Sequence, residues 1–299
     1  MGLFHENGIG IMIQLKMNGD EPEVIQTAEP PLVYLDHWAL RAISEDPSLI
    51  ERFVQSLKSK RGTLAISFRN IMEFRKVSWQ SSQVMADVLA QEVFPNLFFI
   101  EVDPFVVIQK EDEPGAENCL ASIIGQLDLL QYAVDCGSES INPLSLNNFF
   151  SNIWPHREEL GDQSELQIFV AKITEFRQRY LEDPNFKKLV DAPTPGPHIP
   201  RATRSLVRDL LSITTRDQFK KFTFNDVEDF EHTIVPSSYC HILLLDGHWK
   251  TQALNSISRL EGKGRPFFSP LIFSKKDDGI NRAIDAIENW EMEPKGQAK

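Results

Sequence analysis

Five short apolar runs, which alternate with stretches of helical spacing, constrain this sequence more than any other feature. LVYLD (32–36), TLAIS (63–67) and NLFFIEV (96–102) lie in the first third of the chain, and YCHILLLD (239–246) and PLIFS (270–274) lie near its end. Apolar residues recur at helical spacing over 37–60, 68–77, 81–93, 226–235, 248–260 and 278–290. This alternation is typical of an α/β fold with a mainly parallel sheet.

The long segment between these two parts lacks the alternation. Residues 111–221 predict helices alone, over 117–135, 163–182 and 201–221, with a proline-rich link at 192–200. We therefore predict one α/β domain formed by residues 31–110 and 222–299, with a helical insertion at 111–221. Residues 1–30 form an N-terminal extension, in which the apolar stretch 9–15 predicts one extra strand.

The composition fits a globular chain. Hydrophobic residues make up 41% of the 299 residues and charged residues 25%, so a core can form without disulfides. The three cysteines form no close pair, which argues against a structural zinc site. No apolar run approaches the roughly 20 residues that cross a bilayer. We expect a cytoplasmic protein without a membrane partner, and the net charge of −12 argues against unspecific coating of nucleic acid.

Four acidic residues fall where the predicted fold would gather them. Asp36 and Asp246 close predicted strands, Asp229 lies on the helix that precedes the second of these strands, and Glu73 lies two turns into the helix after TLAIS. Ligands of open parallel sheets bind at the carboxyl ends of the strands, and carboxylates are the ligands that Mg²⁺ and Mn²⁺ prefer. Taken singly, such acids are more often structural than catalytic, with Asp36 as a helix N-cap and Asp246 as a turn residue, and it is their combination that favours a metal site.

Three segments resemble the metal motifs of PIN-like domains, a superfamily of bacterial ribonucleases. VYLDHWAL (33–40) is similar to the first PIN strand, SFRNIMEF (67–74) resembles the helix with the metal-binding Glu, and NDVEDFEHTIVPSSYCHILLLDGHW (225–249) resembles the carboxyl-terminal metal motif. The resemblance covers roughly residues 31–110 and 222–290. It implies a PIN-like three-layer α/β fold with a mainly parallel central sheet, into which the helical segment is inserted.

The resemblance also implies roles for individual residues. Asp36, Glu73, Asp229 and Asp246 become ligands of Mg²⁺ or Mn²⁺, and Asp226, one turn before Asp229, could replace or assist it. His232 would orient a carboxylate or contact a phosphate, with a buried structural histidine as the alternative. Asn70 could bind an outer-shell water, whereas Ser67 is better explained as a helix cap. His241 stands where similar sequences often carry Asp, which puts that accessory position in doubt.

Substrate binding requires basic residues near the acids. Arg204 and Arg208 share one face of a predicted helix, Arg69 and Arg75 flank Glu73, and His248 follows Asp246. A solvated helix face is the alternative explanation for the first two.

Together these features predict a metal-dependent endoribonuclease, of the kind that serves as a toxin or defence effector. RNA would be the substrate, and the helical insertion would receive a protein regulator or a second copy of the chain. Two alternatives stay open at this stage. One is an interaction protein with a weakened site on the same fold, and the other is a phosphoesterase that acts on DNA or nucleotides.

Overall fold

A five-stranded parallel sheet forms the centre of the molecule, and its strands coincide closely with the predicted apolar runs. The computed structural model describes residues 13–18, 21–74, 76, 80–113, 119–122, 164–195, 203–261, 263, 269–276 and 278–291. The sheet contains β3 (Leu32–Leu35), β4 (Thr63–Ser67), β5 (Leu97–Ile100), β6 (Ile242–Leu244) and β7 (Leu271–Phe273). The strands β3 to β6 are buried along their whole length, as expected for a parallel sheet covered on both faces, and only the edge strand β7 is partly exposed. The predicted α/β class is confirmed.

The strand order β5-β4-β3-β6-β7 places β3 at the centre. Val33 pairs with Leu64 of β4 on one side and with Ile242 of β6 on the other. The chain moves outward from β3 through β4 to β5, then crosses to the opposite side of β3 for β6 and β7. The direction of winding therefore reverses between β3 and β6, and ligands of open α/β sheets bind at the carboxyl side of such a switch point.

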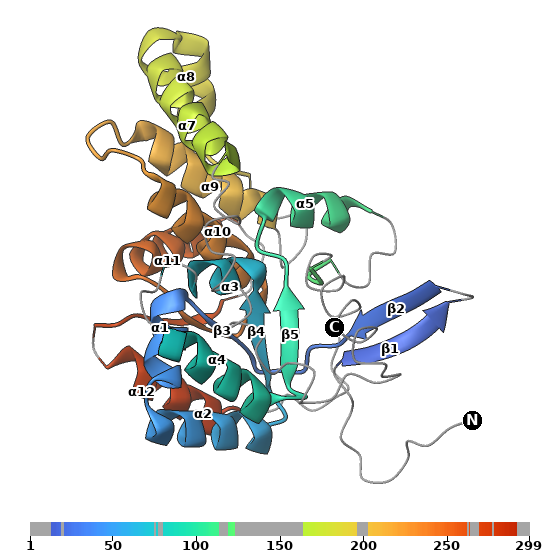
Figure 1. Ribbon diagram of the computed structural model, residues 1–299. Coiled ribbons are helices and arrows are strands. Elements are labelled where there is room, and N and C mark those ends of the chain that lie inside the picture. Colours follow the sequence, from blue (N-terminus) through green and yellow to red (C-terminus); the bar gives the residue numbers. More distant parts are fainter. Residues whose placement is uncertain are drawn as a thin grey trace.

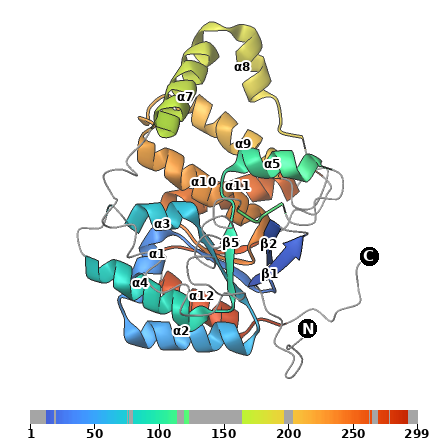
Figure 2. The same ribbon diagram turned by 45° about the vertical axis from the view of Figure 1, so that its right-hand side comes forward.

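Helices cover both faces of the sheet, so that the fold has three layers (Figures 1 and 2). Side chains that alternate along each strand divide the core into two clusters, with Val33 and Leu35 in one and Tyr34 in the other. The first cluster includes residues of α1 (His37–Ser44), α2 (Pro47–Ser59), α3 (Phe68–Phe74), α4 (Gln80–Val93) and α12 (Gly279–Glu288). The second includes residues of α5 (Pro104–Asp112), α7 (Ser164–Glu182), α9 (Thr203–Arg216), α10 (Phe224–Tyr239) and α11 (Gly247–Glu261).

The helical segment between β5 and β6 joins this second cluster. Leu166 and Ile173 of α7 and Leu206 and Leu210 of α9 are buried together with residues of the sheet. In Figure 1, α7 and α8 (Pro184–Asp191) rise above the rest of the molecule. No helix in the described parts of the chain is long and apolar enough to cross a membrane.

Asp-Pro pairs begin three of the helices, and two of these helices were not predicted. Asp46, Asp103 and Asp183 cap α2, α5 and α8, and each is followed by a proline at the first helical position. Each aspartate accepts hydrogen bonds from two backbone N–H groups of the first turn, and proline suits this turn because it needs no donor there. The sequence therefore carried a signal for α5 and α8.

The prediction was wrong around residues 236–241. A strand was expected over 239–246, but α10 continues through Pro236 to Tyr239 and β6 begins only at Ile242. Nearly every residue from Phe230 to Tyr239 is buried, and packing favours the longer helix over the break expected at proline. Of the helix predicted over 117–135, residues 119–122 are not helical, and Ala121 instead forms an antiparallel bridge with Ile100. The remainder of that predicted helix lies outside the described residues.

The N-terminal extension forms a hairpin rather than the single strand that was predicted. Strands β1 (Ile13–Asn18) and β2 (Glu21–Gln26) pair antiparallel beside the main sheet (Figure 1). The buried side chain of Gln26 accepts a hydrogen bond from the Phe99 backbone N–H on β5 at 2.8 Å. This contact links the end of the hairpin to the edge strand.

Candidate metal centre

Asp36 lies at the switch point, directly after β3. Its backbone N–H donates to the Leu244 carbonyl of β6 at 3.0 Å, which fixes it between the two strands. Its carboxylate is the N-cap of α1 and accepts a hydrogen bond from the His37 backbone N–H at 2.6 Å. The side chain is buried, with 7% of the residue exposed. The capping role that was the alternative explanation is therefore confirmed, and it leaves the carboxylate at the carboxyl edge of the sheet.

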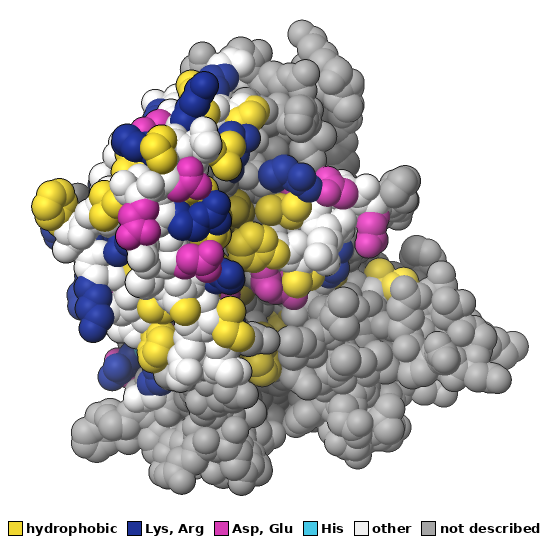
Figure 3. Space-filling view, turned by 90° about the horizontal axis from the view of Figure 1, so that it is seen from above, with side chains coloured by type: hydrophobic (Ala, Val, Ile, Leu, Met, Phe, Trp, Pro, Cys, Tyr) yellow, Lys and Arg dark blue, Asp and Glu magenta, His cyan; other side chains and the backbone are white. Residues whose placement is uncertain are grey.

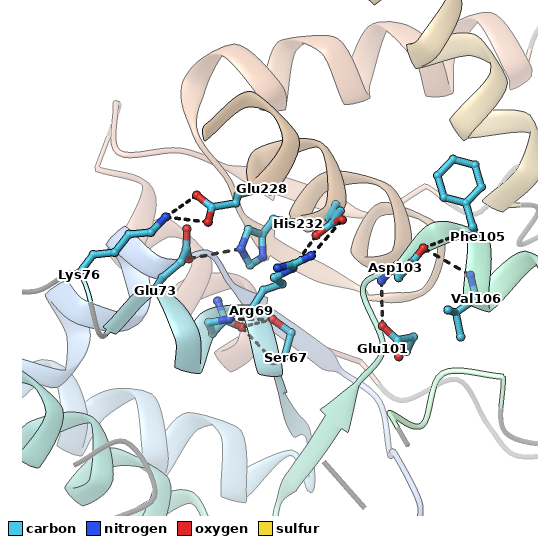
Figure 4. A network of polar contacts seen from close by, with 12 residues as sticks. Ser67, Arg69, Glu73, Lys76, Glu101, Asp103, Phe105, Val106, Glu228 and His232 are labelled. Carbon is cyan, nitrogen blue, oxygen red and sulfur yellow. Dashed lines mark hydrogen bonds and ion pairs between the residues drawn. The ribbon is translucent and has the colours of Figure 1, made fainter. Parts of the chain in front are cut away.

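Glu73 and His232 meet beside Asp36. Glu73 comes from α3 and His232 from α10, and their Oε2 and Nε2 atoms are 3.3 Å apart (Figure 4). One potential ligand atom from each of Asp36, Glu73 and His232 lies within 4.8 Å of the other two. His232 is 1% exposed, so it is a central member of the cluster rather than an accessory to it.

Two further acids complete the electrostatic environment. Asp229 lies one helical turn before His232 on α10, and burial, then Asp36, raises its pKa to about 7. Burial also raises the pKa of Asp36 to about 6, with Glu73 and Asp246 adding to the increase. Asp246 follows β6 by two residues and is exposed, and its carboxylate accepts from the His248 backbone N–H at 2.7 Å. Negative charge is thus crowded at this edge, which favours a bound cation.

The pair formed by Glu73 and His232 shifts both pKa values toward the charged forms. Burial alone would raise the pKa of Glu73, but the neighbouring His232 lowers it below its ordinary value. Burial would lower the pKa of His232, yet the carboxylates of Glu73, Asp36 and Asp229 raise it to about 9. The electrostatic attraction across the site therefore outweighs desolvation for both groups.

A chain of buried hydrogen bonds extends from His232 into the sheet. His232 Nδ1 contacts the hydroxyl of Tyr34, which lies 3.3 Å from Ser67 Oγ. Ser67 in turn bonds to Asn70, whose side-chain N–H donates to the Leu35 carbonyl at 3.1 Å. Ser67 accepts from the Asn70 backbone N–H in the first turn of α3, so its predicted capping role is confirmed. Asn70 is fully buried and holds α3 against β3 rather than facing the open site.

Two ion pairs join the α3 region to α10 (Figure 4). Arg69 Nε lies 2.8 Å from Glu231 Oε2, and Lys76 Nζ lies 2.5 Å from Glu228 Oε2. Both glutamates are largely buried, with side chains 11% and 8% exposed. The pairs therefore hold the helix with Glu73 against the helix with Asp229 and His232. Arg69, for which a substrate-binding role was predicted, thus takes part in one of these ion pairs.

The prediction that Asp226 replaces or assists Asp229 is not supported by its contacts. Asp226 forms a capping box with Thr223 at the start of α10, and one of its oxygens lies 2.6 Å from Lys220 Nζ. Both carboxylate oxygens are thus used in starting the helix. Helical spacing placed Asp226 on the correct face, but it could not show where α10 begins.

His241 was wrongly expected near the acids. It lies directly before β6, where its Nδ1 accepts from the Leu32 backbone N–H at 3.0 Å and its ring packs against Trp290. This is the amino end of the parallel strands, opposite to Asp36. The expectation rested on the resemblance to the carboxyl-terminal metal motif, and the structure places His241 at the opposite end of β6 from Asp246.

The other predicted substrate residues lie on the helical layer. Arg204 pairs with Asp112 of α5, and Arg208 borders a groove lined by apolar residues of α5, α7, α8 and α9. Figure 3 looks down on these helices and shows hydrophobic side chains gathered between basic and acidic ones. His248 lines a small cavity beside Trp249. Arg75 lies outside the described residues.

The residues at the cluster fit a divalent cation on chemical grounds. Among the described residues, the buried atoms Glu73 Oε2 and His232 Nε2 have no hydrogen-bond partner besides the 3.3 Å ion-pair contact with each other. Such atoms carry a cost unless something binds them. Carboxylate oxygens and an imidazole nitrogen within 4.8 Å of one another are suitably spaced for one ion.

The sequence reasoning missed several of these neighbours. No role was predicted for Tyr34, Lys76 or Glu228. Only the alternation of side chains along β3 indicates that Tyr34 faces α10. Comparison with known proteins adds no assignment: a scan against family models, a search of curated proteins and a search of solved structures each gave no match to this chain.

Proposed function

We propose that this chain is a PIN-like, metal-dependent endoribonuclease whose active site is formed by Asp36, Glu73, Asp229 and Asp246. The observation that carries the proposal is the convergence of buried acids at the switch point of the sheet. The carboxylates of Glu73 and Asp246 raise the pKa of Asp36, and together with Asp36 they raise the pKa of Asp229, so the four acids lie within electrostatic reach of one another. The central position of β3 and the order of the motifs along the chain support the same assignment.

The proposed mechanism is hydrolysis without a covalent intermediate. These carboxylates would hold a divalent cation, which would supply Lewis-acid activation of a water molecule and of the phosphodiester. Asp36 and Glu73 provide buried negative charge on two different elements, and Asp229 provides a third carboxylate from α10. Asp246 is exposed and stands at the open side, where a phosphate would approach. Arg69 and Lys76 keep the two ligand-bearing helices at a fixed separation through their glutamate partners.

Cleavage of a single-stranded RNA, compared with DNA of the same sequence, tests this proposal. We expect RNA cleavage with Mn²⁺ or Mg²⁺, none with EDTA, and a rate at least about 100-fold lower for Asp246→Asn, because altering even outer-shell groups of metal sites commonly costs 10–100-fold. Asp191→Asn on α8, which removes an exposed acid far along the helical segment, should cleave like the wild type. Equal cleavage by wild type and Asp246→Asn would assign the activity to another protein. Cleavage of DNA alone would contradict the proposed substrate class.

A further inference from the structure

The buried hydrogen bonds that connect His232 through Tyr34 and Ser67 to Asn70 determine which nitrogen of the His232 ring carries hydrogen. The side-chain N–H group of Asn70 donates to the Leu35 carbonyl at 3.1 Å. A carbonyl can only accept, so the side-chain oxygen of Asn70 faces Ser67. That oxygen accepts from the Ser67 backbone N–H and from the Ser67 hydroxyl, each at 2.9 Å.

Ser67 has one hydroxyl hydrogen, and this bond uses it. The Ser67 oxygen also accepts from the Asn70 backbone N–H at 3.1 Å. Toward Tyr34, at 3.3 Å, Ser67 can therefore act only as an acceptor, and the Tyr34 hydroxyl is the donor.

Because its hydrogen is used toward Ser67, the Tyr34 hydroxyl can only accept a hydrogen bond from His232. The Tyr34 oxygen contacts His232 Nδ1, which must then donate. In a neutral imidazole one nitrogen carries hydrogen and the other has a lone pair. Because Nδ1 is held as the donor, Nε2 is the nitrogen whose hydrogen a metal ion would displace, and the lone pair of the neutral ring then lies on this buried atom, which faces Glu73.

We infer that Tyr34 is a positioning residue that fixes His232 as a nitrogen ligand, so that the site binds a first-row transition-metal ion in preference to Mg²⁺. Asp36 and Glu73 would supply the oxygen ligands beside Nε2. Imidazole suits transition metals, whereas Mg²⁺ prefers oxygen ligands alone and dehydrates reluctantly. Partners that orient a ligating histidine through its other nitrogen are a recurring feature of metal sites. The inference deepens the proposed function and rests on the same site.

Mn²⁺ is a suitable probe because its electron spin reports a bound nitrogen directly. We expect wild-type protein to bind Mn²⁺ at least about 10-fold more tightly than Mg²⁺ in calorimetry, with ¹⁴N modulation in the Mn²⁺ spin-echo signal. His232→Ala should lose both the modulation and the preference. Tyr34→Phe should bind Mn²⁺ about 10–100-fold more weakly while Mg²⁺ binding changes much less, since only the nitrogen ligand loses its orientation.

Tyr239→Phe is the matched control. It also removes a largely buried hydroxyl, one that donates to Glu111 at 2.5 Å and is remote from the cluster, and it should bind both ions like the wild type. If circular dichroism shows that Tyr34→Phe does not fold, Ser67→Ala replaces it, because Ser67 is the next residue after Tyr34 in the series of hydrogen bonds from His232. Mn²⁺ bound without nitrogen modulation, or unaltered Mn²⁺ affinity in a folded Tyr34→Phe, would overturn the inference. Absence of RNA cleavage with nitrogen-coupled Mn²⁺ would instead overturn the proposed function alone.

Discussion

Asp229→Asn is expected to stabilise the metal-free protein at pH 8 and to abolish its stabilisation by metal. Asp229 has a pKa of about 7 in the folded chain, well above its ordinary value of 3.8, because it is buried beside other carboxylates. Its ionisation at pH 8 therefore opposes folding, by roughly 4 kcal/mol for a shift of about three pKa units at about 1.4 kcal/mol each. Asparagine has a similar shape without the charge. The expected increase in Tm is on the order of 5–10 °C in EDTA.

The sign of the pH dependence makes this prediction specific. A carboxyl group with a raised folded pKa binds its proton more tightly in the folded state, so stability is lost as pH rises from about 4 to about 7. The gain from Asp229→Asn should be largest at pH 8 and should fade toward pH 4. Asp246→Asn, which removes an exposed charge of the same site, should change Tm much less.

Metal addition should narrow the difference in stability between the two proteins. An ion at 100 times its dissociation constant stabilises the folded wild type by about 2.7 kcal/mol. Asp229→Asn lacks one proposed ligand and should gain little. Thermal unfolding of both proteins in EDTA and in Mn²⁺ is the measurement. A variant less stable than wild type in EDTA at pH 8 would contradict the described electrostatics, because it would mean that Asp229 stabilises the fold rather than opposing it.

Gly279→Ala is expected to cause the largest loss of stability. Gly279 begins α12, and a Cβ atom there would lie 1.9 Å from the Ser274 backbone oxygen and 2.7 Å from its carbonyl carbon. Both neighbours are backbone atoms, so α12 itself would have to move away from the sheet. Overpacking of this kind typically costs 1–3 kcal/mol, and a clash with backbone places the expected cost at about 3 kcal/mol or more. The corresponding decrease in Tm is on the order of 10 °C.

Gly247 provides the matched control within the same chain. It also begins a helix, α11, but a Cβ there would meet nothing within 4 Å. Gly247→Ala should therefore leave stability within about 0.5 kcal/mol of the wild type, or raise it slightly through the lower entropy of the unfolded chain. Urea unfolding of the two variants gives the comparison. Equal stabilities for the two variants would show that α12 does not approach Ser274 as closely as described.

The strands were predictable because each is a short buried run with clear boundaries. Thr63–Ser67 was predicted residue for residue, and β3 was predicted to within one residue at Asp36. The boundary near Pro236 was not predictable from local pattern, because burial of α10 on all sides outweighs the tendency of proline to end a helix.

The acids of the site were predictable as a group, but their environment was not. Asp36 and Asp246 follow strands, and this position alone brings them to one edge of the sheet. The contact between Tyr34 and His232 joins residues 198 positions apart, and no spacing in the sequence encodes it. Asp226 lies on the helix face that suggested a metal ligand, but its carboxylate forms the capping box with Thr223 at the start of α10.

Calorimetric titration with Mn²⁺ tests the central claim, a metal centre at Asp36, most directly. The wild type should bind Mn²⁺ at the cluster, and the variant with Asp36→Asn and Asp246→Asn should show no such binding while it remains folded by circular dichroism. Asparagine preserves the hydrogen bond from the His37 N–H to residue 36, so folding should be retained. A wild-type protein that takes up no metal, or a double variant that binds as tightly as the wild type, would contradict the metal centre.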